Sequence, residues 1–126
     1  MVNADPVRLV VVVDDEESVR NAVGRLLRAA GWTVKSFASA EDFLSSGVLN
    51  STGCLIADIR MPGMSGLDLQ SRLNGDGYSI PIIFITAHGD EKMRMRAMRA
   101  GAAAFLAKPF DRMVLLERVR ACVESR

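Results

Sequence analysis

The sequence predicts a doubly wound α/β domain in which five parallel strands alternate with five helices. Two observations predict it: short apolar runs of strand length end at polar or charged residues, and the segments between them space their apolar residues as helices do. Such an alternation forms a parallel sheet covered on both faces, with right-handed connections. A chain of 126 residues is long enough for one core, so residues 1–126 are expected to form a single domain.

Five segments are expected to be strands. Four are almost wholly apolar, as is typical of strands buried on both faces, and they span Leu9–Val13, Cys54–Ala57, Ile82–Ile85 and Phe105–Ala107. The fifth, Thr33–Phe37, alternates apolar and polar residues and is expected at an edge of the sheet.

Five segments are expected to be helices. The first carries its apolar residues on one face and ends at Gly31, which can adopt a left-handed cap; that face comprises Val19, Ala22, Val23, Leu26, Leu27 and Ala30. Ser39 can cap a short helix that runs to Leu44 and ends before the polar segment 47–53. The remaining helices are expected over Gly66–Leu73, Asp90–Ala100 and Asp111–Glu124, the last capped by Asp111.

Composition and charge exclude several classes of protein. With 49% hydrophobic and 25% charged residues, the chain has the composition of a soluble globular protein, and a net charge of +1 argues against a general binder of nucleic acid or membrane surfaces. No leader or long apolar span is recognisable, so a cytoplasmic location without membrane contact is expected. Cys54 and Cys122 are expected to be small buried apolar residues rather than a disulfide or a metal pair.

Four of the predicted strands end at polar side chains: Asp14 and Asp15, Asp58, Thr86, and Lys108. Taken singly, each has an ordinary explanation. The aspartate pair could as readily cap a helix as bind a metal, Asp58 could form a turn, Thr86 could bond to local backbone, and Lys108 could be solvated. Because the carboxyl ends of parallel strands meet at one edge of the sheet, the four ends together favour a single polar site.

Such a cluster of carboxylates needs cations. Two unit charges about 4 Å apart repel by about 4 kcal/mol at an effective dielectric constant near 20. Lys108 supplies one positive charge, and a divalent ion would supply two. Oxygen ligands without a nearby His or Cys cluster select a hard cation such as Mg²⁺. A carboxylate beside Mg²⁺, an ammonium and a hydroxyl has the groups needed for phosphoryl transfer.

The ordered set of motifs resembles the receiver domain of bacterial two-component response regulators. The set comprises Asp14-Asp15, Asp58 followed by Met61-Pro62-Gly63-Met64-Ser65-Gly66, Thr86-Ala87, and Lys108-Pro109-Phe110. The run from Arg60 to Gly66 is especially similar to the FixJ-type branch. The resemblance covers nearly the whole chain and implies a flavodoxin-like sheet with strand order 2-1-3-4-5.

The resemblance also implies the role of each site residue. Asp58 would be the phosphoacceptor. Asp15, Asp58 and the backbone carbonyl of Arg60 would bind Mg²⁺, with Asp14 assisting through water. Thr86 and Lys108 would contact the phosphoryl group.

Other positions matched by the resemblance concern the switch and the lifetime of the phosphorylated state. Phe105 occupies the position of the switch aromatic, and the Lys108-Pro109 bond is expected to be cis. In this family the positions of Arg60 and His88 influence how fast the phosphoryl group is lost.

The implied function is a switch rather than enzymatic turnover. A sensor histidine kinase would donate the phosphoryl group, which adds charge and acceptor oxygens that can draw in Thr86 and Lys108. Phe105 would then rearrange and change the surface formed by the last two helices and the last strand, where response regulators commonly form homodimers or meet an output domain. The sequence leaves open whether the domain stands alone or belongs to a longer transcription factor with a C-terminal DNA-binding domain.

Other interpretations remain open or are disfavoured. The basic, Met-rich segment Asp90–Ala100 fits a partner surface and a solvated helix equally well. A receiver-like module that never takes phosphate would usually lack one of the motif residues, and none is missing. A flavodoxin-like cofactor binder is disfavoured because the first loop, Asp14 to Glu17, is acidic and would repel phosphate. Direct nucleic-acid binding is weaker still, because the net charge is near neutral.

Overall fold

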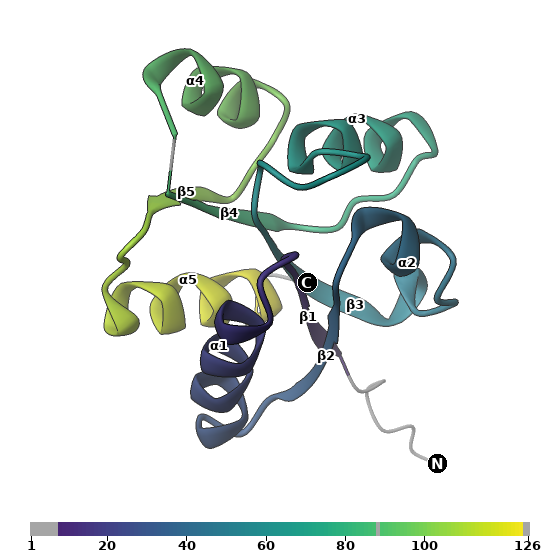
Figure 1. The fold of residues 1–126 in the computed structure, drawn as a ribbon. Coiled ribbons are helices and arrows are strands. Elements are labelled where there is room, and N and C mark those ends of the chain that lie inside the picture. The colour runs from purple at the N-terminus through teal and green to yellow at the C-terminus, as the bar shows by residue number, and fades with distance from the viewer. Residues whose placement is uncertain (1–7, 88, 125–126) are drawn as a thin grey trace.

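The computed structural model describes residues 8–87 and 89–124 and confirms the predicted fold class. Five strands form one parallel sheet in the order β2-β1-β3-β4-β5 (Figure 1). They are β1 (Leu9–Val13), β2 (Thr33–Phe37), β3 (Thr52–Ala57), β4 (Ile82–Thr86) and β5 (Ala104–Ala107). The helices are α1 (Glu17–Ala29), α2 (Ala40–Leu44), α3 (Gly66–Gly75), α4 (Glu91–Arg99) and α5 (Arg112–Glu124), with a short 3₁₀ turn at Leu49–Ser51.

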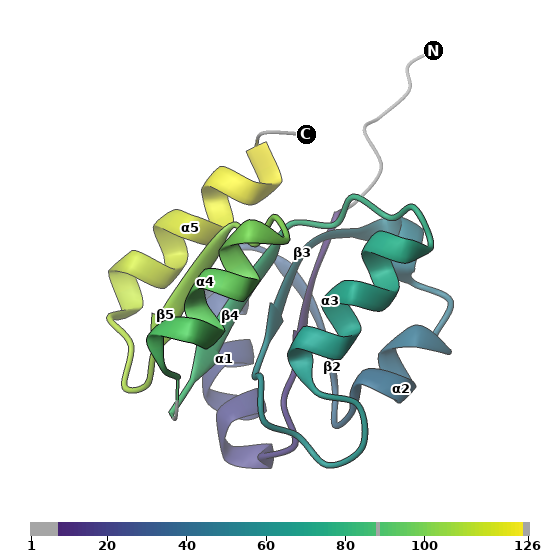
Figure 2. The same ribbon diagram turned by 90° about the horizontal axis from the view of Figure 1, so that it is seen from above.

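Helices cover both faces of the sheet (Figure 2). The sheet separates two layers of apolar side chains. Successive strand residues point to opposite faces, so Val11 of β1 packs in the layer under α2, α3 and α4, whereas Val10 and Val12 pack in the layer under α1 and α5. Strands β1 and β3 are buried along their whole length. Burying one such side chain contributes about 1.5–3 kcal/mol, so these two strands anchor the core that positions the site.

Strand β2 lies at an edge of the sheet, as its alternating pattern predicts. Val34 is its one buried residue, and Phe37 is half-buried. The register between β1 and β3 shifts between Leu9 and Val10. Strand β3 begins two residues earlier than expected, at Thr52.

The buried stripe of α1 differs from the predicted face. Val23, Gly24 and Leu27 are buried, whereas Ala22 and Ala30 are exposed. Exposing a methyl group costs little apolar burial, so the two alanines can lie at the edge of the stripe. Gly31 has φ 99°, the left-handed conformation expected of it, and its amide donates to the carbonyl of Arg28 at 2.9 Å.

The other helix ends agree with the sequence to within two residues. Ser39 Oγ accepts a hydrogen bond from the Asp42 amide at 3.0 Å, and Asp111 Oδ1 accepts from the Met113 amide at 2.8 Å, so both predicted caps are present. Asp90 caps α4 by accepting from the Met93 amide at 2.8 Å. None of the helices within residues 8–87 and 89–124 is long and apolar enough to cross a membrane.

Candidate functional site

The carboxyl ends of β1, β3, β4 and β5 bring the predicted polar residues to one edge of the sheet. Asp58 directly follows β3, the middle strand, and its amide donates to the carbonyl of Val13 at the end of β1 at 3.1 Å. The backbone amide of Lys108 donates to the carbonyl of Thr86 at 2.9 Å. These backbone hydrogen bonds fix where the side chains of Asp58 and Lys108 begin.

Lys108 links the carboxylates of the site. Its Nζ lies 3.0 Å from Asp58 Oδ2, 3.2 Å from Asp14 Oδ2 and 3.8 Å from Glu16 Oε1. Its side chain is 14% exposed, and those of Asp58 and Asp14 are 8% and 0% exposed. Because water screens these charges poorly, the ion pairs orient the ammonium firmly toward the two aspartates.

The Asp58 carboxylate is also held by backbone amides. Its Oδ1 accepts from the amide of Ile59 at 2.6 Å and, at the longer distance of 3.4 Å, from the amide of Arg60. One oxygen is therefore bonded to backbone and the other to Lys108. The carboxylate is pre-oriented at the strand end, as a reacting group must be.

Asp14 is buried and forms an ion pair, and it does not cap α1. The residue at the helix N-cap is Glu16, and Asp14 Oδ1 accepts from the Glu16 amide at 2.9 Å. Burial raises the pKa of Asp14 and outweighs the lowering by this hydrogen bond and by Lys108; the charge of Asp58 raises it further. Burial lowers the pKa of Lys108, but its hydrogen bonds to Asp58 and Asp14 raise the pKa by more, so it lies above its ordinary value.

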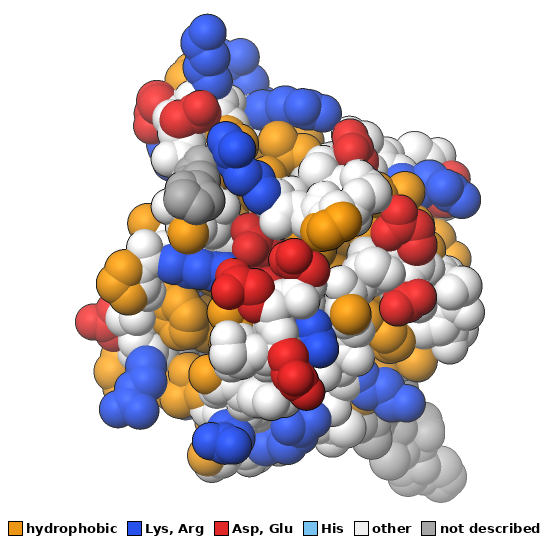
Figure 3. Space-filling view, in the orientation of Figure 1, with side chains coloured by type: hydrophobic (Ala, Val, Ile, Leu, Met, Phe, Trp, Pro, Cys, Tyr) orange, Lys and Arg blue, Asp and Glu red, His pale blue; other side chains and the backbone are white. Residues whose placement is uncertain are grey.

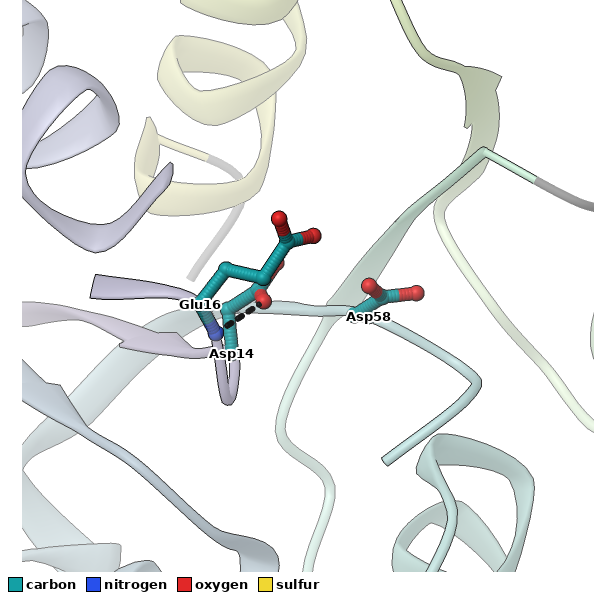
Figure 4. A group of neighbouring side chains, drawn as sticks. All are labelled: Asp14, Glu16 and Asp58. Carbon is teal, nitrogen blue, oxygen red and sulfur yellow. Dashed lines mark hydrogen bonds between the residues drawn. The ribbon is translucent and has the colours of Figure 1, made fainter. Parts of the chain in front are cut away.

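Three carboxylates form a group that could hold a metal ion: Asp14, Glu16 and Asp58 each place one oxygen within 4.8 Å of the others (Figure 4). In the space-filling view, acidic side chains gather at the centre of this face with a basic side chain beside them (Figure 3). Glu16 was not anticipated as a member, because its place before α1 looks like an ordinary first-turn acid. Asp15 is exposed and outside this group, and its assignment as a metal ligand stays a prediction.

The donor set fits a hard divalent cation. All three potential ligand atoms are carboxylate oxygens, and among residues 8–87 and 89–124 the cation that pairs with them is the ammonium of Lys108. Three negative charges against one positive charge leave the group short of positive charge, which a divalent ion would balance.

Thr86 and Phe105 lie next to each other beside this site. Thr86 is 1% exposed, and Phe105 is half-buried with its ring centroid 6.4 Å from that of Phe84. A Cβ atom added to Gly89 would lie 2.8 Å from both the Phe105 ring and the Thr86 methyl group, so both side chains border Gly89. Side chains that border the same residue lie close enough for a rearrangement of one to affect the other.

The remaining predicted positions are placed as follows. The Lys108-Pro109 peptide bond is cis, as expected. Arg60 is exposed in the loop after Asp58. His88 lies outside the described residues.

Comparisons with known proteins agree with this geometry. The family model for the response regulator receiver domain matches residues 10–120. The chain belongs to this family. Among curated relatives, Nodulation protein W of Bradyrhizobium diazoefficiens is 47% identical to this receiver domain over 116 residues, which are 92% of this chain and 51% of that protein. The transcriptional regulatory protein FixJ of Azorhizobium caulinodans is 44% identical over 110 residues, covering 87% of this chain and 52% of that protein.

Solved structures of other receivers match this one closely. The response regulator StyR superimposes with a TM-score of 0.87 at 47% identity, covering 94% of this chain and 60% of that chain. The FixJ-N structure gives a TM-score of 0.84 at 40% identity and covers 94% and 95% of the two chains. The receiver domain thus spans about half the length of the curated relatives it matches. It is a signalling switch of two-component systems, related to transcriptional regulators.

Proposed function

We propose that this receiver domain accepts a phosphoryl group on Asp58 from the phosphohistidine of a sensor histidine kinase. The observation that carries the proposal is the Lys108 ammonium 3.0 Å from an almost buried carboxylate at the end of the middle strand. A solvent-exposed carboxylate needs no such partner, because water solvates its charge. A carboxylate that must attack phosphorus needs a cation in place to neutralise the charge of the incoming oxygens.

The proposed reaction uses the side chains at the strand ends. A carboxylate oxygen of Asp58 attacks phosphorus, the bond to the histidine nitrogen breaks, and the imidazole leaves with the electron pair. Lys108 neutralises charge on the phosphoryl oxygens, and Thr86 donates its hydroxyl to one of them. The same groups would assist attack by water and thus loss of the phosphoryl group, so the domain assists its own phosphorylation and dephosphorylation without turning over a separate substrate.

Mg²⁺ is the proposed cofactor. It would neutralise charge on the phosphoryl oxygens, a task for which a hard cation is suited. Asp15, Asp58 and the backbone carbonyl of Arg60 would hold it, with Asp14 acting through a water molecule. Glu16 is a further candidate, because its carboxylate belongs to the group formed by Asp14 and Asp58.

The proposed output is a change in the surface formed by α4, β5 and α5. Thr86 would move toward the phosphoryl group, and Phe105 would occupy the space that it leaves. Met95 and Met98, each 39% exposed, lie on α4 among basic residues, which supports a homodimer or partner contact there. A shift from 1:99 to 99:1 needs about 5.5 kcal/mol of differential stabilisation, within reach of a few charge-assisted hydrogen bonds.

The proposed context is a longer cytoplasmic regulator. Residues 1–126 would form one receiver domain, and a DNA-binding output domain would follow on its C-terminal side. The support is that the relatives are about twice as long and that one of them is named a transcriptional regulatory protein. This receiver would itself contact neither nucleic acid nor membrane.

Phosphorylation of Asp58 can be tested with acetyl phosphate and Mg²⁺. We expect one hydroxylamine-labile phosphoryl group on the wild type, none on Asp58→Asn, and none after the metal is chelated. Asp76→Asn is the matched control, because Asp76 is an exposed carboxylate at the far end of α3 and should leave labelling unchanged. Equal labelling of Asp58→Asn and wild type would show that the assignment is wrong.

The switch can be tested separately from phosphorylation. Thr86→Ala should still accept phosphate, but should need a much higher protein concentration to dimerise in the presence of beryllofluoride, because the hydroxyl contact that favours the active state is missing. Thr33→Ala, an exposed threonine on edge strand β2, is the control. Sedimentation of the proteins with and without beryllofluoride measures the effect. If Thr86→Ala dimerises as the wild type does, Thr86 does not transmit the signal.

A further inference from the structure

One side chain of α2 contacts the loop that follows the site. This loop, residues 60–65, leads from the end of β3 to the start of α3. Glu41 Oε2 accepts a hydrogen bond from the backbone amide of Met64 at 3.0 Å, across a separation of 23 residues in the chain. The contact is made with the backbone of the loop, so it constrains the path of the chain there.

Glu41 projects from a rigid base. It lies in the first turn of α2, a helix capped by Ser39, and two other residues of this helix, Ala40 and Phe43, are completely buried. Among residues 8–87 and 89–124, no lysine or arginine forms an ion pair with Glu41. Its charge therefore acts on the Met64 amide, and a hydrogen bond to a charged acceptor is stronger than one between neutral groups.

The loop is shaped to receive this carboxylate. Gly63 has φ 75°, and a Cβ atom added to it would lie 2.6 Å from Glu41 Oε2. A side chain at this position would therefore displace the carboxylate from the loop. Glu41 thus fits against two consecutive residues of the loop, Gly63 and Met64.

The base of the loop holds the carboxylate of Asp58. The Gly66 amide donates to the carbonyl of Ile59 at 2.9 Å and closes the loop. The amides of Ile59 and Arg60 donate to Asp58 Oδ1 at 2.6 Å and 3.4 Å. Because Arg60 begins the loop and its hydrogen bond is the longer one, this bond is the first that a displaced loop would lose.

We propose that Glu41 is a positioning residue for the phosphorylation of Asp58. By holding the far side of the loop, it keeps the backbone of Arg60 directed toward the Asp58 carboxylate. The group of carboxylates found among the described residues of the site does not include Glu41, so Glu41 acts through the loop. The inference rests on the proposed function, because it assumes that Asp58 accepts the phosphoryl group.

The rate of labelling by acetyl phosphate and Mg²⁺ tests this role. Glu41→Ala should slow labelling by about fivefold, because small displacements of reacting groups lower the rate steeply. Glu41→Gln should restore most of the rate, since its amide oxygen can accept the same hydrogen bond. Asp42→Ala is the matched control. Asp42 is also an exposed acid in the first turn of α2, but within the described part of the chain its carboxylate accepts no hydrogen bond, so labelling should be unchanged.

Hydrogen exchange of the Met64 amide, followed by NMR, reports on the loop without any phosphorylation. Exchange should be faster in Glu41→Ala than in the wild type and in Asp42→Ala, because the amide has lost its acceptor. Equal exchange in the wild type and Glu41→Ala would show that Glu41 does not hold the loop.

Three results of the labelling experiment would overturn the positioning role. They are a Glu41→Ala variant that is labelled as fast as the wild type, a Glu41→Gln variant as slow as Glu41→Ala, and an Asp42→Ala variant slowed equally. A wild type that takes no phosphate would instead contradict the proposed function, and the exchange of the Met64 amide would then decide whether Glu41 holds the loop.

Discussion

Replacing Gly66 with alanine should destabilise the domain at the point where α3 meets the site. A Cβ atom at this position would collide with the carbonyl oxygen of Asp58 and lie 3.0 Å from Ile59 Cα. Both contacts are with backbone, which cannot rotate away as a flexible side chain would. Overpacking of this kind costs about 1–3 kcal/mol, and the rigid surroundings place Gly66→Ala near the upper value.

A change of about 3 kcal/mol corresponds to a fall of about 12 °C in the unfolding midpoint for a domain of this size. The matched control is Gly75→Ala in the same helix. Nothing lies within 4 Å of a Cβ atom added there, so alanine should gain about 0.5 kcal/mol from its better helix propensity. Thermal melts of the two variants should therefore move in opposite directions.

The same substitution should also slow the labelling of Asp58 by acetyl phosphate in protein that remains folded, because the strained backbone belongs to the phosphoacceptor itself. A Gly66→Ala variant that melts within about 2 °C of the wild type would refute the steric argument. So would a Gly75→Ala variant that is destabilised equally, since that would point to a general intolerance of α3 to alanine.

Three further predictions concern the metal, the contact between α3 and α4, and pH. Mg²⁺ at a hundredfold excess over its dissociation constant should stabilise the wild type by about 2.7 kcal/mol, and Asp15→Asn should lose most of this gain. If Mg²⁺ raises the melting temperatures of wild type and Asp15→Asn equally, the ion binds elsewhere. Gln70→Ala should lower the free energy of unfolding by about 1–2 kcal/mol, because Gln70 is 2% exposed and hydrogen-bonded. Asn74 is also hydrogen-bonded but is exposed, so Asn74→Ala should change the free energy of unfolding by about 0.5 kcal/mol or less. Equal losses for the two variants in urea titrations would contradict this prediction. The amide and hydroxyl of Ser65 lower the pKa of Asp68 below 3.8, so the ionised Asp68 stabilises the fold above that pH, and this stabilisation is lost as the pH falls through the lower folded-state pKa. The difference in thermal unfolding midpoint between wild type and Asp68→Asn should therefore disappear in acid. A difference that stays constant with pH would refute this prediction.

The fold and most of the site could be predicted because the same sequence feature, apolar strands that end at polar residues, indicates both. Strands buried on both faces must be apolar throughout, so the polar residues Asp58, Thr86 and Lys108 at their ends stand out in the sequence. Parallel topology then places those ends at one edge. The ion pairs of Lys108 with Asp14 and Asp58 follow from that placement, although only the structure gives their lengths.

Features that depend on packing across the chain could not be predicted in this way. Cys54 and Cys122 lie in the same apolar layer although one is in a strand and the other in a helix far away in sequence, and apolar periodicity marks both residues simply as buried. The membership of Glu16 in the carboxylate group depends on its side-chain conformation, which a loop position does not reveal. The close approach at Gly66 could not be predicted either, because a glycine at the start of a helix usually indicates a turn.

The hydrogen bonds between α3 and α4 fix one end of α4. Gln70 Nε2 donates to the carbonyl of Ala97 and Asn74 Nδ2 to the carbonyl of Ala100, both at 3.0 Å, so both anchors lie at the C-terminal end of α4. A motion of α4 that keeps these bonds is a tilt about that end. Nine residues rise about 13 Å, so a tilt of about 10° carries the first turn of α4 by about 2 Å while the last turn stays in place. The helix would then pivot about its contact with α3, and its N-terminal end would move together with the loop beside Thr86.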